Sequence, residues 1–418
     1  MAYESLSKLL YKDTTPDRFA RNEALARERL NAESTFRTGV FSDAGEFFLA
    51  MPRELQVQMA HILQNERHIA SLVSGYVGME RGALIRSLVI DEVVSTNDIE
   101  GVYSTRRQIG DLLEAKEGTG LMSERRFREL TCLYLSLDTA APQPPTTLAD
   151  IRAIYDQVMD SEPLSPEDRP DGRLFRKDEV SIHRPDGKTV HTGLFPERAI
   201  AQALERALAI TTADEIPPLV AALMAHFIFE YAHPFYDGNG RTSRYLLALW
   251  LRSSLTIYTV LSLSRIIAEN RGRYYRAFTD AEKPQNHGEL TLFVMHLLDE
   301  IALAQTQIVE SHNERRAILD RGFSAMPQIQ EVYGLSLEEA NVLMLVFQYE
   351  LFTQLGETPL DAIVAYADAS KQTVRKRTLR LTEAGLLETT SQRPLRFRLT
   401  NEACKILGLM HPSELHRR

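Results

Sequence analysis

Apolar residues in this chain recur at the spacing of an α-helix, and this pattern constrains the fold more than any other feature. Between residues 52 and 137 they fall repeatedly at positions i, i+3 and i+4, as in Ile85, Leu88 and Val89. A second helical block covers residues 148–300, and a polar helix continues from residue 301 to about residue 320. The pattern predicts an all-α fold.

Two stretches interrupt the helical pattern. The three prolines between Ala140 and Thr147 predict a linker, and residues 180–190 contain two short β-prone runs around a Pro-Asp-Gly turn, which predicts a β-hairpin. We expect four segments: an N-terminal helical region over residues 1–140, a helical core over 148–300, a connector helix over 301–336 and a C-terminal module over 337–418.

The composition excludes several classes of protein. Of the 418 residues, 44% are hydrophobic and 25% are charged, as in ordinary soluble proteins. A net charge of -9 argues against a generally basic nucleic-acid binder, and the two cysteines provide no disulfide framework or zinc motif. The apolar runs are too short to span a bilayer, and the first residues lack the pattern of a secretory signal. We therefore expect a cytoplasmic protein without a membrane partner.

One helix is predicted to stop abruptly and a second to begin a few residues later. Residues 219–231 form a wide apolar stripe, but Pro234, Gly238 and Gly240 do not suit a continuing helix. An apolar helix resumes at about Arg241. The loop between the two helices therefore ends in Gly-Asn-Gly at a helix N-terminus.

This loop suits a phosphate group. Free backbone N–H groups and the positive end of the helix dipole attract anions, and glycines allow close approach. We expect the side-chain amide of Asn239 to add a donor, and Arg241 and Arg244, three residues apart, to clamp further oxygens. Asp237 suits a Mg²⁺ ion that bridges phosphates, and His233 is the one residue of the loop whose unperturbed pKa suits proton removal near neutrality. Each residue alone has an ordinary structural explanation, but the combination points to a phosphate-transfer site.

The segment His233-Pro-Phe-Tyr-Asp-Gly-Asn-Gly-Arg-Thr-Ser-Arg244 resembles the signature of Fic-domain proteins at every specified position. Two further stretches are similar to the family, residues 172–176 (Gly-Arg-Leu-Phe-Arg) and 271–276 (Arg-Gly-Arg-Tyr-Tyr-Arg). The resemblance covers roughly residues 50–300. It implies a Fic-type helical core and transfer of a nucleotide, most often AMP from ATP, to a Tyr, Ser or Thr hydroxyl of a target protein, which could include the protein itself.

The resemblance also implies roles for individual residues. His233 would be the base that deprotonates the hydroxyl, Phe235 would anchor the loop, and Asp237 would hold Mg²⁺. The hairpin near residue 180 resembles the family's flap, which holds the target peptide as an added strand. The remaining assignments concern ATP: Gly238, Asn239 and Gly240 around the α-phosphate, Arg241 and Arg244 on the β- and γ-phosphates, and Tyr274 and Tyr275 near the adenine. Relatives often have a tryptophan where Leu290–Phe293 stands here, so the choice of nucleotide is left open.

Residues 95–101 (Ser-Thr-Asn-Asp-Ile-Glu-Gly) end another apolar helix. Thr96 and Glu100 share a helix face, and Gly101 suits the position after the helix end. An acid in the last turn opposes the helix dipole, so Glu100 is either exposed or paired with a specific cation. The pattern resembles the family's inhibitory motif, which implies that Glu100 pairs with Arg244 and blocks the γ-phosphate.

The C-terminal module is predicted to contain helices at residues 358–366 and 371–384, followed by strands at 386–390 and 395–400. This order resembles a winged helix-turn-helix. Eight basic residues lie between positions 370 and 398, of which Lys371, Arg375, Lys376 and Arg377 are the candidate DNA contacts. A docking or homodimerisation module with solvated charge explains the same pattern.

The sequence supports three hypotheses about the function. The first is a protein adenylyltransferase that uses ATP and Mg²⁺ and is inhibited by its own N-terminal helix. The second is a DNA-binding regulator whose core only senses a nucleotide. The third is an enzyme that transfers another nucleotide, or removes AMP with Glu100 positioning the water.

Overall fold

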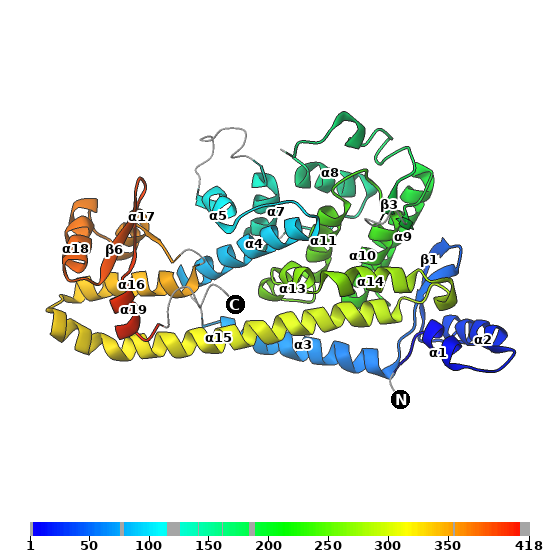
Figure 1. Ribbon diagram of the computed structural model, residues 1–418, viewed down its shortest axis with the longest axis horizontal. Helices are drawn as coiled ribbons and strands as arrows, with labels where there is room; N and C mark the ends of the chain where they lie inside the picture. The colour runs from blue at the N-terminus through cyan, green and yellow to red at the C-terminus, as the bar shows by residue number, and fades with distance from the viewer. Residues whose placement is uncertain are drawn as a thin grey trace. The chain divides into compact units, whose positions relative to one another are not determined.

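The computed structural model describes residues 3–75, 79–114, 126–140, 142–160, 162–183, 189–353 and 356–409. The chain divides into two compact units. Unit 1 comprises Met1–Ala70 and Val89–Thr306, and unit 2 comprises Ser71–Leu88 and Gln307–Arg418. Figure 1 shows the order of elements along the chain. This division is coarser than the four segments expected from the sequence, whose boundaries therefore stay predictions.

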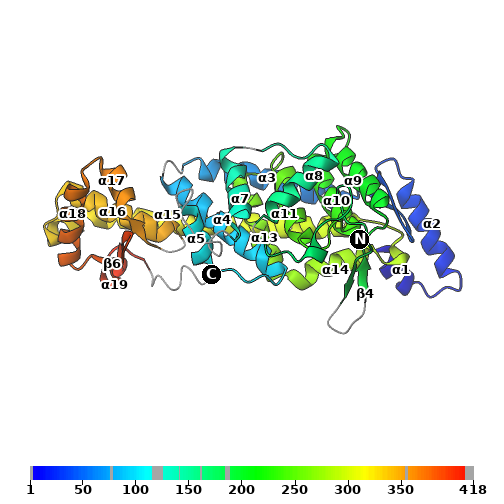
Figure 2. The same ribbon diagram turned by 90° about the horizontal axis from the view of Figure 1, so that it is seen from above.

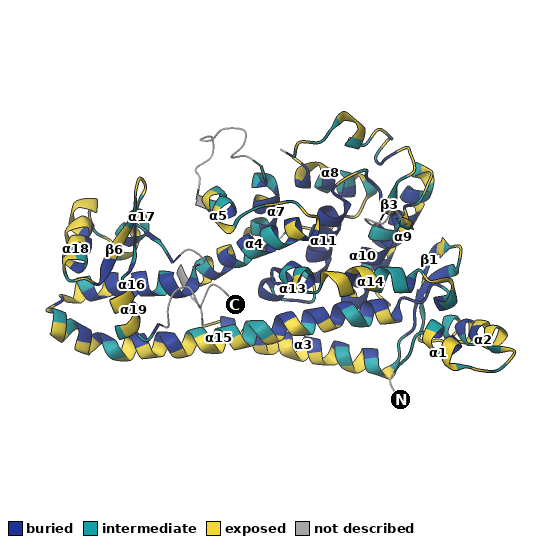
Figure 3. Ribbon diagram, viewed as in Figure 1, coloured by how far each residue is buried: buried dark blue, intermediate teal, exposed yellow. Residues whose placement is uncertain are grey.

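The core of unit 1 is built on three successive helices. They are α9 (Glu197–Thr212), α10 (Pro218–Ala232) and α11 (Asn239–Leu251), with α10 packed against both neighbours. Pro218 suits the first turn of α10, where an N–H has no intrahelical partner, and nearly every residue of α10 and all of α11 are buried (Figure 3). The loop between α10 and α11 is therefore held from both sides by the most buried part of the unit.

The remaining helices of unit 1 surround this core, as expected for an all-α fold. They are α1 (Leu6–Lys12), α2 (Arg18–Leu30), α5 (Arg106–Glu114), α7 (Arg128–Thr139), α8 (Leu148–Val158), α12 (Ile257–Val260), α13 (Leu263–Glu269) and α14 (Arg271–Ala281), with α3 (Arg53–Val73), α4 (Met79–Ile99) and α15 (Thr291–Tyr333) shared between the units. Short 3₁₀ turns cover Pro166–Asp168 and Pro284–Asn286. Residues 142–147 form neither helix nor strand, so the predicted linker separates α7 from α8. Thr147 caps α8 in a reciprocal capping box with Asp150.

Unit 1 contains two β-hairpins, of which the sequence predicted one. Strands β3 (Ser181–His183) and β4 (Thr189–Thr192) pair antiparallel, with Ser181 opposite Thr192, and confirm the predicted hairpin. Its predicted turn lies outside the described residues. The second hairpin joins β1 (Phe36–Ser42) to β2 (Gly45–Leu49). It was missed, although β-prone runs on either side of Ser-Asp-Ala-Gly are a hairpin signal.

The expected connector helix is part of a much longer helix. Helix α15 begins at Thr291, ten residues before the predicted start, and continues through Pro327 to Tyr333. The sequence changes from apolar to polar near residue 301, within this helix, and the prediction placed the start of a separate helix there. In the described part of the chain, α15 is the one helix long and apolar enough to cross a membrane. Core helices of soluble proteins also meet these two criteria. Its first turns are buried in unit 1 through Leu297, Leu298 and Ile301.

Unit 2 contains the predicted C-terminal elements. Helices α17 (Leu360–Ala367) and α18 (Lys371–Glu383) precede strands β6 (Leu387–Gln392) and β7 (Leu395–Leu399), as expected. A short strand β5 (Thr358–Pro359) completes a sheet of order β5-β7-β6, and α16 (Leu337–Phe352) and α19 (Asn401–Ile406) flank it. The Ser370 side chain caps α18 by accepting from the Thr373 amide. The interpretation as a winged helix-turn-helix stays a prediction.

Candidate active site

His233 stands at the point where α10 ends. Its backbone is left-handed, with φ 46° and ψ 64°, and its N–H donates to the Phe229 carbonyl at 3.0 Å. Left-handed residues commonly end helices, although glycine is the usual choice. The chain turns here, and Phe235 then inserts fully into the core, where its ring stacks on Tyr155 with centroids 3.6 Å apart. Phe235 is thus placed as the expected loop anchor.

The Gly-Asn-Gly segment begins α11 as predicted, but the Asn239 side chain differs from the expectation. Its Oδ1 accepts from the Phe235 amide at 2.9 Å, and its Nδ2 donates to the Phe235 carbonyl at 2.7 Å. Asn239 is buried, so this amide braces the loop from inside and is not directed at an anion. The prediction of a side-chain donor for phosphate is therefore wrong, and the backbone amides at the start of α11 are the groups that suit an anion.

The two glycines allow other side chains to approach the loop. Gly238 has φ 77°, and a Cβ there would overlap the Met159 side chain. A Cβ at Gly240 would overlap the Glu100 carboxylate. Glu100 therefore lies directly against the first turn of α11, where an anion would approach.

Arg244 is held by the last turns of α4. Its Nη2 is 2.7 Å from Oε1 of Glu100 and donates to the Thr96 carbonyl at 3.1 Å, while its Nε donates to Oγ1 of Thr96 at 2.7 Å. Gly101 follows with φ 72°, as its predicted place after the helix requires. Burial opposes the charge on Arg244, but the Glu100 carboxylate outweighs it, and the pKa of Arg244 is raised. The expected Glu100–Arg244 ion pair is confirmed.

Arg241 pairs with a carboxylate from another segment. Its Nη1 is 2.9 Å from Oε1 of Glu162, and both side chains are almost fully buried. The other carboxylate oxygen of Glu162 accepts from Arg126 at 3.2 Å. Glu162 lies in the segment after α8, and the assignment of Arg241 and Arg244 to the phosphates stays a prediction. Nothing local in the sequence marks Glu162 as the partner.

His233 is a neutral imidazole. Burial lowers its pKa to about 3, and the positive charges of His191 and Arg176 act in the same direction. The backbone of Glu230 beside the ring opposes part of this shift, and Nδ1 is buried, which leaves Nε2 as the nitrogen able to face a substrate. A neutral imidazole is the form that can accept a proton.

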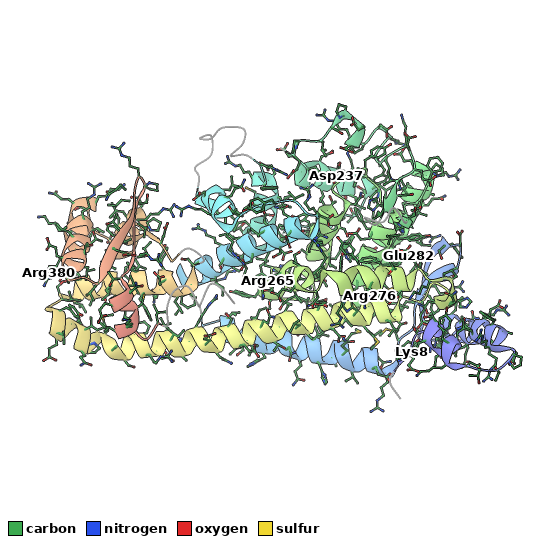
Figure 4. All side chains as sticks on the ribbon, in the orientation of Figure 1. Lys8, Asp237, Arg265, Arg276, Glu282 and Arg380 are labelled. Carbon is green, nitrogen blue, oxygen red and sulfur yellow. The ribbon has the colours of Figure 1, made fainter. Side chains whose placement is uncertain are left out.

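Asp237 is exposed at the mouth of the loop (Figure 4), and its Oδ1 accepts from the Gly238 amide at 2.6 Å. In the described part of the chain, no three His, Cys, Asp or Glu residues are grouped closely enough to form a metal site of their own. Mg²⁺ is usually held by one or two carboxylates together with substrate phosphates. A single accessible carboxylate next to the anion-binding turn fits such an ion.

The two tyrosines expected near an adenine lie in different environments. Tyr274 is 1% exposed, and its hydroxyl is 2.8 Å from Nε2 of His226, whose Nδ1 is 2.7 Å from Oγ of Ser243. The prediction for Tyr274 is therefore wrong, because a side chain enclosed in this buried network cannot contact a ligand. Tyr275 is 44% exposed and donates to the Ile99 carbonyl at 3.3 Å, beside Glu100.

The candidate DNA contacts lie in unit 2 on α18. Lys371, Arg375 and Lys376 are exposed and Arg377 is partly exposed, so all four are accessible. Lys371 is 2.7 Å from Oδ1 of Asp361. Other basic residues of the module serve its fold: Arg396 pairs with Glu357, Arg398 with Glu350, and Arg380 donates to the Tyr333 carbonyl.

Comparison with known proteins identifies the class of this core. Residues 145–251, which contain α8 to α11, match the family model described as the Fic/DOC family. The chain is 26% identical over 213 residues to "Protein adenylyltransferase Fic" of Drosophila ananassae, covering 50% of this chain and 39% of that protein. It is 25% identical over 249 residues to the protein of the same name from Drosophila melanogaster, covering 56% and 46%. The chain thus spans less than half the length of these relatives.

Two solved structures align with much of this chain, each with a TM-score below 0.5. A Fic family protein from Desulfovibrio desulfuricans G20 is 18% identical with a TM-score of 0.48, covering 82% of this chain and 96% of that one. Fic-1 (residues 134–508) of C. elegans is 17% identical with a TM-score of 0.45, covering 73% and 79%.

Proposed function

We propose that this protein is a protein adenylyltransferase, which transfers AMP from ATP to a Tyr, Ser or Thr hydroxyl of a target protein. One observation carries the proposal: a neutral His233 and an anion-binding helix start lie at the two ends of one loop, and Arg244 is buried one turn into α11. Base, anion site and cation are the three groups that nucleotidyl transfer needs. The relatives named protein adenylyltransferase support the same reaction.

In the proposed reaction, the hydroxyl oxygen attacks the α-phosphorus of ATP. The bond from this phosphorus to the oxygen that bridges it to the β-phosphate breaks, and pyrophosphate leaves. Nε2 of His233 takes the hydroxyl proton, and the amides at the start of α11 stabilise the charge that develops on the α-phosphate oxygens. Asp237 would hold a Mg²⁺ ion, which would neutralise charge on the phosphates. The enzyme contributes mainly positioning and electrostatic stabilisation.

We also propose that Glu100 inhibits the enzyme. Its carboxylate engages Arg244, the cation assigned to the γ-phosphate, and lies against Gly240 where phosphate would enter. The negative charge of Glu100 at this place would repel the phosphates of ATP. The same carboxylate occupies Arg244, the side chain that would otherwise bind the γ-phosphate. ATP would then bind in a position unsuited to transfer until Glu100 moves.

The test is AMP transfer from ATP labelled in the α-phosphate, onto the protein itself and onto proteins in a lysate. Transfer that requires His233 supports the proposal. ATP binding without a covalent label, even after Glu100 is removed, would instead favour a nucleotide-sensing regulator. Release of AMP from labelled proteins by the wild type would favour the reverse reaction with Glu100 positioning water.

A second function is favoured by the exposed basic face of α18. Arg375, Lys376 and Arg377 are consecutive on α18, and the acid of this helix, Glu383, lies at its other end. A helix with such a basic stretch can contact DNA phosphates. We propose duplex DNA as a partner of unit 2. A docking or dimerisation surface is the alternative, and duplex binding at low salt separates the two.

A further inference from the structure

The carbonyl end of α10 is contacted by side chains from both sides of the β3–β4 hairpin. A helix C-terminus carries partial negative charge, so cations there are stabilising. Here the last carbonyls of α10 are those of Tyr231, Ala232 and His233, immediately beside the proposed base. Figure 2 shows the hairpin projecting from this part of unit 1 next to α14.

Arg176 contacts this end from the segment before β3. It is fully buried, its Nε donates to the His233 carbonyl at 2.8 Å, and its Nη2 donates to the Leu194 carbonyl at 2.8 Å. The Leu194 amide in turn donates to the Ala232 carbonyl at 3.1 Å. The segment before the hairpin is therefore fixed to the His233 carbonyl, and the segment after it is fixed to the Ala232 carbonyl.

His191 makes the corresponding contact from within strand β4. Its Nε2 lies 2.9 Å from the Tyr231 carbonyl oxygen, and its Nδ1 lies 2.8 Å from Oε2 of Glu282, the residue after α14. A carbonyl and a carboxylate can only accept, so both ring nitrogens must carry protons. The ring is therefore an imidazolium. Its side chain is 9% exposed, and it fastens strand β4 to the end of α10 and to Glu282.

We propose that His191 is a positioning residue of the transfer site: its imidazolium fixes β4 between α10 and α14 and so sets the place of the hairpin relative to His233. The inference rests on the proposed function and on the family resemblance, which implies that the hairpin holds the target as an added strand. If the strand moves, the acceptor hydroxyl moves away from the base, although ATP binding is unaffected.

The surroundings of His191 determine its protonation. Burial opposes the charged ring, whereas Glu282, which follows α14, the Tyr231 carbonyl and Glu230 from α10 favour it; His233, whose ring centroid is 6.3 Å away, is neutral. Burial lowers the pKa of His191, but the hydrogen bond to Glu282 outweighs it, and the pKa is raised. The contact is therefore complete below the ordinary histidine pKa and is lost as pH rises through the raised pKa. A neutral imidazole carries one N–H, so it can donate either to the Tyr231 carbonyl or to Glu282 but not to both.

Hydrogen exchange of the hairpin tests the contact without any enzyme assay. We expect His191→Gln to speed amide exchange in peptides covering β3 and β4 by about tenfold or more, which corresponds to about 1.4 kcal/mol, while peptides from α11 keep their protection. Glu282→Gln should lower the pKa of His191, so that the hairpin loosens at a lower pH than in the wild type. His191→Lys, which keeps a charge and several donors, should retain protection to a higher pH. His61→Gln, an exposed histidine on α3, is the matched control.

Transfer assays then connect the contact to catalysis. In a Glu100→Gly background, His191→Gln should lower self-labelling by about tenfold or more at saturating ATP, with an unchanged ATP dissociation constant by calorimetry, and His191→Lys should restore most of it. Hairpin exchange that is the same in His191→Gln, Glu282→Gln and wild type would overturn the proposal. Loosened exchange with unchanged labelling would also overturn it, since the contact would then not position the target. If Glu100→Gly itself transfers no AMP, the proposed function fails, and the exchange data show independently whether the contact exists.

Discussion

The Glu100 carboxylate is 2.7 Å from Nη2 of Arg244 and fills the space that a side chain at Gly240 would need. One acid thus engages the cation of the site and covers its anion-binding turn. Arg244 is 2% exposed at its side chain, and Thr96 accepts from its Nε. The position of Arg244 is therefore fixed by α4, and removal of Glu100 alone leaves the Thr96 contacts in place.

Asp237→Ala should impair transfer without affecting stability. The carboxylate is exposed and its contact to the Gly238 amide is local, so the fold loses little. If the residue holds Mg²⁺, the Mg²⁺ concentration for half-maximal transfer should rise by about tenfold or more, as for a lost ligand or ligand-orienting group. Magnesium titrations of labelling in the Glu100→Gly background measure this. Asp214→Ala, an exposed aspartate outside the site, is the control, and equal titrations for both variants would remove Asp237 from the metal site.

Glu162→Ala and Arg241→Ala should be strongly coupled. Glu162→Ala leaves the buried charge of Arg241 without this partner, a loss that costs about 3–5 kcal/mol, whereas Arg241→Ala leaves Glu162 with Arg126 alone and should cost less; each should lower the thermal midpoint. The double variant removes both charges and should lose less than the sum of the two losses. Thermal unfolding of the four proteins measures the coupling, with Glu167→Ala as an exposed control. Additive losses would show that the pair is not formed in solution.

His226 should make unit 1 sensitive to acid. Burial, with Arg244 nearby, lowers its pKa to about 3, while the unfolded chain has the ordinary value near 6.5. The unfolded state therefore binds the extra proton between these values, and stability falls as pH drops from about 6.5 toward 3. His226→Gln keeps a polar side chain and removes this titration. Its thermal midpoint should vary less with pH over that window than the wild type's, and identical pH dependence would contradict the assignment.

Arg375→Ala with Arg377→Ala should weaken duplex DNA binding at low salt. Each phosphate contact contributes close to one unit to the slope of log affinity against log salt, so the slope should fall by about two. Fluorescence anisotropy with a labelled duplex measures both quantities. Lys405→Ala, on α19 of the same unit, is the matched control. Absence of duplex binding by the intact wild type would favour a docking surface.

The sequence predicted the parts of the fold and site that depend on local pattern. The break between α10 and α11 and the β3–β4 hairpin follow from residue spacing and turn residues, whereas the buried loop anchor Phe235 was expected through the family resemblance. The Glu100–Arg244 pair joins residues far apart in sequence, and it was expected through the family resemblance, because a short acidic motif alone left two readings open.

The side-chain contacts that the sequence did not predict depend on which polar partner a buried side chain meets. Asn239 was expected to face phosphate, but its amide matches the Phe235 backbone four residues earlier. Arg241 pairs with Glu162, which lies far away in the sequence. Tyr274 was expected at the adenine, but His226 holds it in the core. Periodicity tells which face of a helix is buried, and it does not tell which polar group a buried side chain meets.

The most direct test of the central claim compares three variants in one labelled-ATP transfer assay. Glu100→Gly should raise transfer roughly ten- to a hundredfold over the wild type, because a charge-assisted pair is worth about 1.5–3 kcal/mol and 1.4 kcal/mol is tenfold. Glu100→Gly with His233→Ala should lose at least ~10²-fold of that activity through the missing base, and Arg244→Ala should not activate although it also breaks the pair. Equal transfer by wild type and Glu100→Gly would contradict the inhibitory role, and near-parental transfer without His233 would contradict the proposed mechanism itself.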